Sequence, residues 1–375
     1  MGLTDVHISG YRSVRSIRFP MRQLTVLVGA NGVGKTNLYR ALELVQGAAT
    51  GEMGLSIARE GGLGSVMWAG ERQATDMPLL TLEVGLDHSI DDVPLAPRYR
   101  IEVGFGDSQY EAIFAHEPKV KFETLSIAQG KRRVDVLERK QIAAWYRDDT
   151  GARRHLDEPL LNTETALSAL RGTLPELDSV RHLLGNWRFY HGFRSDGGSP
   201  VRRPALAVTS PLLDADGGNL AAVLATLVHI RNDTTALDQT IDDAFPGAKL
   251  IVPPPGEFAT FTLRFPEFPK RQFGAHELSD GTVQFLAMAG ALLSYRLPPL
   301  IALNEPENSL HPDLLPALAR LIARAAGRTQ VLVVTHSRIL ADALAEETGT
   351  IPREVIRKNG GTWLEGLSNL GQFDD

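Results

Sequence analysis

A glycine-rich loop between an apolar strand and a helix is the feature of this sequence that most restricts its fold. The stretch LTVLV is followed directly by GANGVGKT, and TNLYRALELVQ continues with apolar residues at helical spacing. Glycines let backbone N–H groups turn inward around phosphate oxygens, and the start of a helix adds partial positive charge. In such a loop Lys35 reaches the β and γ phosphates and Thr36 ligates Mg²⁺. The sequence therefore predicts an α/β nucleotide-binding fold, with a phosphate site made of Gly29, Ala30, Asn31, Gly32, Val33, Gly34, Lys35, Thr36 and Asn37.

Composition excludes several other classes of protein. The chain has 375 residues, a net charge of −6 and no cysteine, so a disulfide framework or a thiolate metal site is impossible. The first residues lack the apolar core of a signal peptide, and the most apolar long window contains Arg296 and prolines. We therefore expect a cytoplasmic protein with no membrane span. The acidic net charge gives no general attraction to nucleic acid, although basic residues gather locally in YRSVRSIRFPMR, KRRVDVLERK and VRRP.

Hydrophobic periodicity indicates three consecutive segments. Residues 1–75 hold two short strands, the phosphate loop with its helix, and a glycine-rich stretch at 50–75 that we expect to be loop-like. Residues 76–240 begin with alternating runs up to about residue 150, including YEAIFAHE, which is typical of an antiparallel meander. Helical spacing then predicts an insert, in which Asn219 or Asp216 would cap one helix. Residues 241–375 alternate helix and strand, as a parallel sheet requires.

Three further motifs in the last segment also suit phosphate chemistry. HELSDGT places Ser279 at the start of an apolar helix, where its hydroxyl and the following N–H groups form a potential anion site. LIALNE then ends a buried strand on Asn304 and Glu305, and QVLVVTH ends the next strand on His336. No N-K-x-D guanine-reading motif is present, which weighs against a GTPase.

The order of these motifs resembles the ABC-type ATPase heads of the RecF, SMC and OLD group. The resemblance covers roughly residues 3–45 and 272–345, with weaker similarity in NWRFYHGFRSD and DGGNLAAVL. Within that group the chain is most similar to compact RecF-like AAA ATPases that carry LSDGT and NEPE motifs. The resemblance implies a P-loop fold with a mostly parallel sheet flanked by helices, to which the meander and the helical insert are added.

The resemblance also implies roles for individual residues. Glu305 would orient the attacking water as general base, and His336 would sense the γ phosphate. Ser279, Asp280 and Gly281 would form a signature turn that contacts the γ phosphate of nucleotide held by a second copy. Asn308 to His311 would form the D-loop at that interface, Arg12 would lie near the phosphates, and Gln73 is a candidate for the metal-contacting glutamine. Asp280 stands where relatives have glycine, so we expect it to point away from phosphate or to meet a cation.

Asn304 stands where most relatives have the aspartate that holds Mg²⁺ through a coordinated water. An asparagine keeps the shape and one oxygen acceptor but loses the charge. Mg²⁺ keeps several waters that a neutral carbonyl can still accept. We therefore predict weakened metal binding and a slow ATPase that uses ATP and Mg²⁺.

The expected activity is an ATP-dependent homodimer that acts as a switch or clamp. One hypothesis places it on double-stranded DNA, in repair or in defence against foreign DNA. The alternative is a regulatory switch for a separately encoded nuclease or toxin, without direct DNA binding. The energising subunit of a membrane transporter fits less well, because the insert is large and the SLHP turn is RecF-like.

Overall fold

The structure is a computed structural model that describes residues 2–71, 78–90, 93–106, 117–231 and 233–373. The chain divides into two compact units that are each discontinuous in sequence. Unit 1 comprises residues 1–22, 29–187 and 353–375, and unit 2 comprises residues 23–28 and 188–352. Gln73 and the predicted strand YEAIFAHE, apart from Glu117, lie outside the described residues.

Unit 1 is built on an antiparallel sheet whose strand order, over the described residues, is β11-β10-β9-β8-β7-β4-β1-β2. The predicted meander is therefore confirmed, and the first two strands of the chain join it because β1 pairs with β4. Apolar residues alternate along these strands, so one face of the sheet is buried. The strands are β1 (Gly2–Tyr11), β2 (Val14–Pro20), β4 (Leu79–Asp87), β7 (Arg98–Gly104), β8 (Lys119–Gln129), β9 (Arg132–Lys140), β10 (Ala143–Arg147) and β11 (Arg153–His155), beside a small hairpin of β5 (Ser89–Ile90) and β6 (Val93–Pro94).

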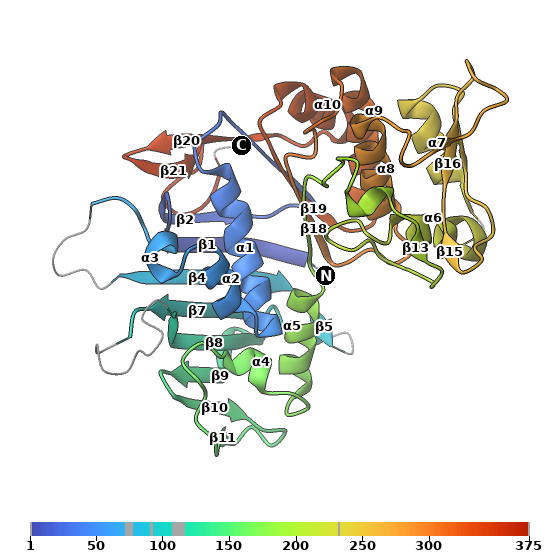
Figure 1. The fold of residues 1–375 in the computed structure, drawn as a ribbon. Coiled ribbons are helices and arrows are strands. Elements are labelled where there is room, and N and C mark those ends of the chain that lie inside the picture. Colours follow the sequence, from blue (N-terminus) through green and yellow to red (C-terminus); the bar gives the residue numbers. More distant parts are fainter. Residues whose placement is uncertain (1, 72–77, 91–92, 107–116, 232, 374–375) are drawn as a thin grey trace. The chain divides into compact units, whose positions relative to one another are not determined.

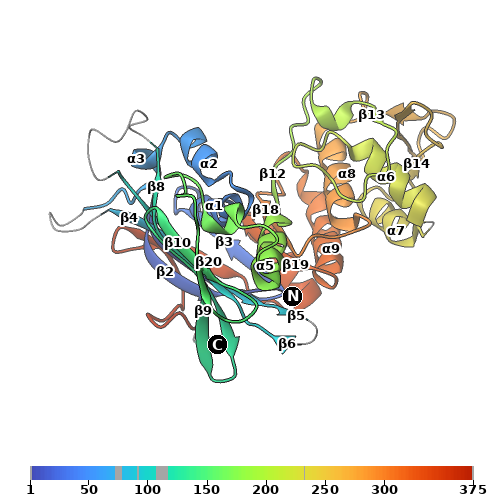
Figure 2. The same cartoon turned by 90° about the horizontal axis from the view of Figure 1, so that it is seen from below.

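The helices of unit 1 lie on one face of this sheet (Figures 1 and 2). They are α1 (Lys35–Thr50), α2 (Met53–Arg59), α3 (Leu63–Val66), α4 (Ala166–Ala169) and α5 (Pro175–Gly185). Helix α1 is central, since it packs against α2, α4, α5 and β1. A buried carboxylate ties α4 to the sheet: Glu123 accepts hydrogen bonds from Tyr99 Oη and from the N–H groups of Ala166 and Leu167. Burial raises the pKa of Glu123.

The prediction that residues 50–75 are loop-like is wrong for part of that stretch. Helices α2 and α3 form there, and Met53, Ile57, Leu63 and Val66 are buried. The glycines in this stretch suggested a loop. They instead lie between and within two short helices, each too short to show a clear apolar period. A hairpin of β20 (Arg353–Lys358) and β21 (Gly361–Leu364) from the far end of the chain also belongs to unit 1.

Unit 2 contains the predicted parallel sheet, with β12 (Arg188–His191), β18 (Leu300–Asn304), β19 (Gln330–Thr335) and β3 (Leu24–Val28) side by side in that order. Every side chain of β3 and β19 is buried, as expected for parallel strands covered on both faces. The register pairs His191 with Asn304, and Thr335 with Val28. Since all four strands are parallel, their carboxyl ends lie at one edge of the sheet.

The helices of unit 2 share one apolar core with this sheet (Figure 1). Helix α8 is buried along nearly its whole length, which explains why it is apolar on every side. The elements are α6 (Leu220–Thr226), α7 (Thr235–Ala244), α8 (Asp280–Leu293), α9 (Leu315–Ala326) and α10 (Arg338–Thr348), the short helical turns η1 (Pro200–Arg202), η2 (Leu227–Arg231) and η3 (Pro312–Leu314), and the small strands β13 (Ala205–Leu206), β14 (Lys249–Ile251), β15 (Phe258–Ala259), β16 (Thr262–Arg264) and β17 (Phe273–Gly274).

The cap predicted for the helix at residue 220 differs from the one observed. Asn219 does occupy the N-cap position of α6, but its side chain makes no capping hydrogen bond. Its amide instead bridges the preceding loop, donating to Leu212 O and accepting from Asp214 N. The residue thus fixes the chain that enters the helix rather than the first turn of the helix.

The two units have other bounds than the three segments 1–75, 76–240 and 241–375 expected from sequence. The reason is strand pairing over long separations. Strand β1 pairs with β4 across the phosphate-loop region, and β3 pairs with β19, so consecutive stretches of chain end in different units. Within the described ranges, no helix combines the length and apolarity needed to cross a lipid bilayer.

Candidate functional site

The phosphate loop leaves β3 after Val28 and enters α1 at Lys35. Gly34 occupies the N-cap position with a φ of 99°, in the left-handed region that favours glycine. The side chain of Lys35 is folded against the loop, where its Nζ donates to Gly29 O at 2.7 Å and to Ala30 O at 2.8 Å. The residue is only 4% exposed. The lysine is thus held at the loop, which is what a phosphate-binding amine requires.

Residues remote in sequence hold this loop in shape. Ser13 Oγ lies 2.7 Å from Thr362 Oγ1 and accepts from Asn37 Nδ2 at 2.7 Å. Thr362 Oγ1 in turn donates to Val33 O at 2.8 Å. Arg357, in β20, donates to Gly32 O at 3.0 Å. The C-terminal hairpin therefore buttresses the loop, a role that no sequence motif indicated.

Arg12 lies in the turn between β1 and β2 with a φ of 47°. Its Nη2 donates to Glu60 Oε2 at 2.6 Å, and Tyr11 Oη donates to the same oxygen at 2.8 Å. Burial raises the pKa of Tyr11, so this hydroxyl stays protonated and donates. The structure thus gives Arg12 a carboxylate partner, Glu60. That Arg12 lies near the nucleotide phosphates stays a prediction.

The carboxyl edge of the unit 2 sheet gathers the predicted strand-end residues. Asn304 ends β18, and its Oδ1 is buried without a hydrogen-bond partner among the described residues. Glu305 follows with a φ of 50°, again in the left-handed region, and its N–H donates to Val334 O at 2.7 Å. Asn308 Nδ2 donates to Glu305 Oε2 at 3.0 Å. A non-glycine residue held in this conformation is typical of functional sites.

His336 follows β19 and lies beside this carboxylate. Its Nδ1 is 3.8 Å from Glu305 Oε1 and 3.1 Å from Oε1 of a second acid, Glu307. The imidazole is 41% exposed, whereas the side chain of Glu307 is 5% exposed. The structure therefore brings Asn304, Glu305 and His336 to one edge, and it adds Glu307, which sequence reasoning missed. The only available signal was the second glutamate in NEPEN.

The predicted signature turn lies at the start of α8. Ser279 Oγ accepts from Thr282 N at 3.2 Å, so the serine caps the helix. Asp280 meets a cation, since its Oδ1 accepts from Arg202 Nη2 at 2.6 Å. Gly281 allows a close approach to the D-loop, because a Cβ there would lie 2.9 Å from Ser309 O. The turn and the D-loop are therefore packed as one surface of unit 2.

Arg202 organises the signature turn and was missed because VRRP reads as a solvated basic run. Its guanidinium is buried and donates to Ser195 O, Ala275 O and Leu278 O at 2.6–2.7 Å, in addition to Asp280. A buried guanidinium is stable only when its donors are paired, and here Ser195 O and two carbonyls of the loop before α8 pair them. Only the folded chain reveals this contact, which spans more than seventy residues.

The residues present fit a nucleotide with a metal ion in two respects. The phosphate loop provides a glycine cradle with a buried lysine, which matches phosphate. The unpartnered Asn304 Oδ1 matches a metal-bound water that needs an acceptor. Among the described residues no group of three or more His, Cys, Asp or Glu side chains is placed to hold a metal. Mg²⁺ bound with the nucleotide would therefore take most of its oxygen ligands from the phosphates and from water.

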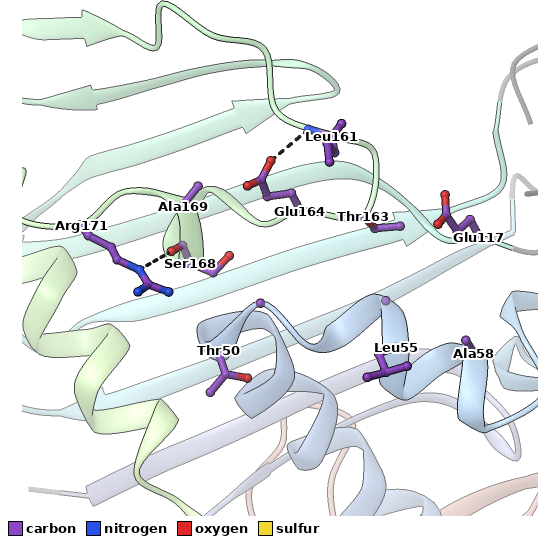
Figure 3. A pocket seen from close by; sticks show the side chains of 12 residues that line it. Thr50, Leu55, Ala58, Glu117, Leu161, Thr163, Glu164, Ser168, Ala169 and Arg171 are labelled. Carbon is purple, nitrogen blue, oxygen red and sulfur yellow. Dashed lines mark hydrogen bonds between the residues drawn. The ribbon is translucent and has the colours of Figure 1, made fainter.

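A separate pocket of about 570 Å³ lies in unit 1 at the C-terminal end of α1 (Figure 3). Its lining includes Thr50 of α1, Leu55 of α2, Ser168 of α4 and the loop residues Glu164 and Arg171. The phosphate loop adjoins the opposite end of α1, about 22 Å away at 1.5 Å per residue. This pocket is therefore not the nucleotide site.

Comparison with known proteins shows the same kind of fold. The chain aligns over 97% of its length with the crystal structure of an SmcHead bound to the C-winged helix domain of ScpA, at 13% identity with a TM-score of 0.55 and 97% of that chain covered. An Smc head domain with an extended coiled coil, bound to the C-terminal domain of ScpA derived from Pyrococcus furiosus, matches at 13% identity with a TM-score of 0.51, over 97% of this chain and 95% of that one. The α/β P-loop ATPase fold of SMC heads predicted from sequence is thus confirmed.

Sequence comparisons point to the same class. A stretch of 108 residues is 31% identical to Elongation factor 3 of Gonapodya prolifera (strain JEL478), covering 28% of this chain but only 10% of that protein. Residues 24–342 match the family described as "AAA domain, putative AbiEii toxin, Type IV TA system". Because this match takes in most of the chain, from β3 to α10, the protein belongs to that family of AAA-type P-loop ATPases.

Proposed function

We propose that the chain binds ATP with Mg²⁺ and hydrolyses it slowly, and that ATP joins two copies head to tail as a switch. The observation that supports this most directly is the edge of the unit 2 sheet, where Glu305 is held by Asn308 beside His336. A site used only for binding nucleotide has no need for a carboxylate fixed in a strained backbone conformation. The family match supports nucleotide hydrolysis in general.

Each residue has a distinct task in this proposal. Bound Mg-ATP supplies the γ phosphate that is transferred to water. Lys35 and the N–H groups of the phosphate loop bind and orient the phosphates. Glu305 accepts a proton from the attacking water, as a positioned carboxylate can. Ser279 and the first N–H groups of α8 are offered to nucleotide on the second copy, since the start of a helix favours anions.

Complementation between two inactive variants tests the head-to-tail arrangement. Lys35→Ala removes the phosphate-loop amine, and Ser279→Arg blocks the signature turn, so each variant alone is expected to be inactive. In a mixed dimer, one site combines the intact loop of one chain with the intact turn of the other. An equimolar mixture should recover about a quarter of wild-type ATPase activity, because half of the dimers are mixed and each has one intact site of two.

The same mixture provides its own control. Two samples of a single variant at the same total concentration should stay inactive. Light scattering shows whether the two variants form dimers in the mixture. If they do, and the mixture is no more active than either variant alone, the composite site is contradicted. ATP hydrolysis by Ser279→Arg alone would show that the turn is not needed.

Asn304 is expected to limit metal affinity. Asn304→Asp adds a charge that strengthens the contact with a metal-bound water. The Mg²⁺ concentration for half-maximal ATPase activity should fall by up to about tenfold, which corresponds to about 1.4 kcal/mol. Asn369→Asp adds the same charge at an exposed position and should leave the Mg²⁺ titration unchanged. An identical Mg²⁺ dependence in Asn304→Asp and wild type would remove this explanation.

The partner of the switch is a further proposal. Double-stranded DNA and a separately encoded nuclease or toxin both stay predictions. The family description names a toxin of a toxin–antitoxin system, which supports a role in defence. The Smc heads among the similar structures are bound to ScpA domains, which supports a protein partner.

A further inference from the structure

Glu307 is a buried acid that the proposed hydrolysis does not yet use. It lies two residues after Glu305, and its side chain is 5% exposed. One carboxylate oxygen, Oε1, collects the contacts: Thr335 Oγ1 donates to it, His336 N donates at 3.0 Å and Ser337 N at 3.2 Å. The carboxylate thus ties the loop after β19 to the loop after β18.

The same oxygen also faces the imidazole. His336 Nδ1 lies 3.1 Å from Glu307 Oε1 and 3.8 Å from Glu305 Oε1. A ring nitrogen that faces two carboxylate oxygens is most stable when it carries the proton, since its lone pair would otherwise oppose theirs. This arrangement leaves Nε2 as the ring nitrogen available to another ligand. Carboxylates often select the tautomer of a functional histidine in this way.

The charge of Glu307 calls for an explanation of its own. Burying a carboxylate is costly, and Oε2 is buried without a hydrogen-bond partner among the described residues. A glutamine could accept from Thr335 Oγ1 and from both N–H groups through its amide oxygen at lower cost. The backbone contacts therefore do not require an acid. The nearby imidazole does benefit from one, because a negative charge 3.1 Å from Nδ1 attracts a proton on that nitrogen.

We propose that Glu307 is a positioning residue that fixes the His336 loop and keeps the proton on Nδ1. His336 can then present Nε2 to the γ phosphate while Nδ1 stays next to Glu305. This role rests on the proposed ATP hydrolysis. It adds to that proposal a second acid, Glu307, which affects hydrolysis only through His336. Glu307 itself touches neither nucleotide nor water in this role.

A double-mutant cycle in the full-length protein tests this role. Glu307→Gln should lower kcat about tenfold, the loss expected when one charge-assisted contact becomes neutral, and it should change the KM for ATP less than about twofold. In a His336→Ala background the same substitution should have no further effect on kcat, since the residue it acts through is gone. Glu347→Gln makes the same chemical change at an exposed position of α10 and should behave as wild type. Thermal unfolding of all variants reports any general loss of structure.

A second readout does not depend on turnover. Nitrogen-15 NMR of the histidine side chains, with His336 assigned by its absence in His336→Ala, should show the proton on Nδ1 in wild type. In Glu307→Gln, signal from the other tautomer should grow. Should that variant fail to fold, the wild-type spectrum still decides, because a proton on Nε2 alone would overturn the proposal.

The outcomes separate this inference from the proposed function. Equal losses of kcat from Glu307→Gln in the wild-type and His336→Ala backgrounds would mean that Glu307 does not act through the histidine. Full activity of Glu307→Gln would likewise overturn the inference, and in both cases ATP hydrolysis would stand. A wild-type protein that does not hydrolyse ATP would instead refute the proposed function, and the NMR result would still test the contact.

Discussion

Replacing Glu305 with glutamine is expected to lower ATP turnover by about 10²–10⁴-fold, the usual contribution of a general base. A glutamine keeps the length of the side chain and can still accept the hydrogen bond that Asn308 Nδ2 donates at 3.0 Å. It cannot take a proton from the attacking water. ATP should therefore bind with near-normal affinity and remain intact, so the dimer should persist. Single-turnover hydrolysis and light scattering in the presence of ATP measure both effects.

The position of Glu305 makes this test selective. Its φ of 50° is unfavourable for any residue other than glycine, at a cost of about 1–3 kcal/mol. The substitution keeps that backbone strain, because glutamine and glutamate have similar backbone preferences. Stability should hardly change, and Glu347→Gln serves as the control for a lost surface charge. Unimpaired hydrolysis by Glu305→Gln would identify another group as the base.

The phosphate loop should tolerate alanine very differently at two of its glycines. Gly34→Ala is expected to abolish most nucleotide binding, because its Cβ would lie 2.0 Å from Thr362 Oγ1 and 2.4 Å from Ser13 Oγ. Those two hydroxyls are hydrogen-bonded to each other and to the loop, so they cannot move apart without releasing Val33 O. Overpacking of this kind costs about 1–3 kcal/mol in addition to the strain of a positive φ.

Gly32→Ala is the matched control. Its φ of 80° imposes a similar backbone strain, but its Cβ would meet nothing within 4 Å. We expect it to lose only about 1–2 kcal/mol of stability, the cost of the left-handed conformation. Chemical denaturation gives the stability of both variants, and calorimetric titration with ATP gives their affinity. Equal effects at the two positions would show that the hairpin does not support the loop in solution.

The local motifs could be predicted from the order of residues alone. The phosphate loop, the strand end at Asn304 and Glu305, and the serine cap at Ser279 each depend on spacing within one turn, strand or helix. Such features are set by backbone geometry over a few residues, so the printed order of residues is sufficient to predict them. The alternating meander and the buried parallel strands were predictable for the same reason, since side-chain periodicity follows directly from strand geometry.

The contacts that support these motifs are visible only in the folded chain. Thr362 and Ser13 reach the phosphate loop from opposite ends of the chain, and Arg202 contacts the turn before α8 across a sequence separation of 76 residues. Glu307 lies two residues after Glu305 in sequence, yet its proposed role depends on a histidine that follows another strand. The helices within 50–75 were missed for a related reason. Strand pairing and side-chain burial depend on contacts between segments that are far apart in sequence. Local patterns of residues do not indicate which of these segments will come together.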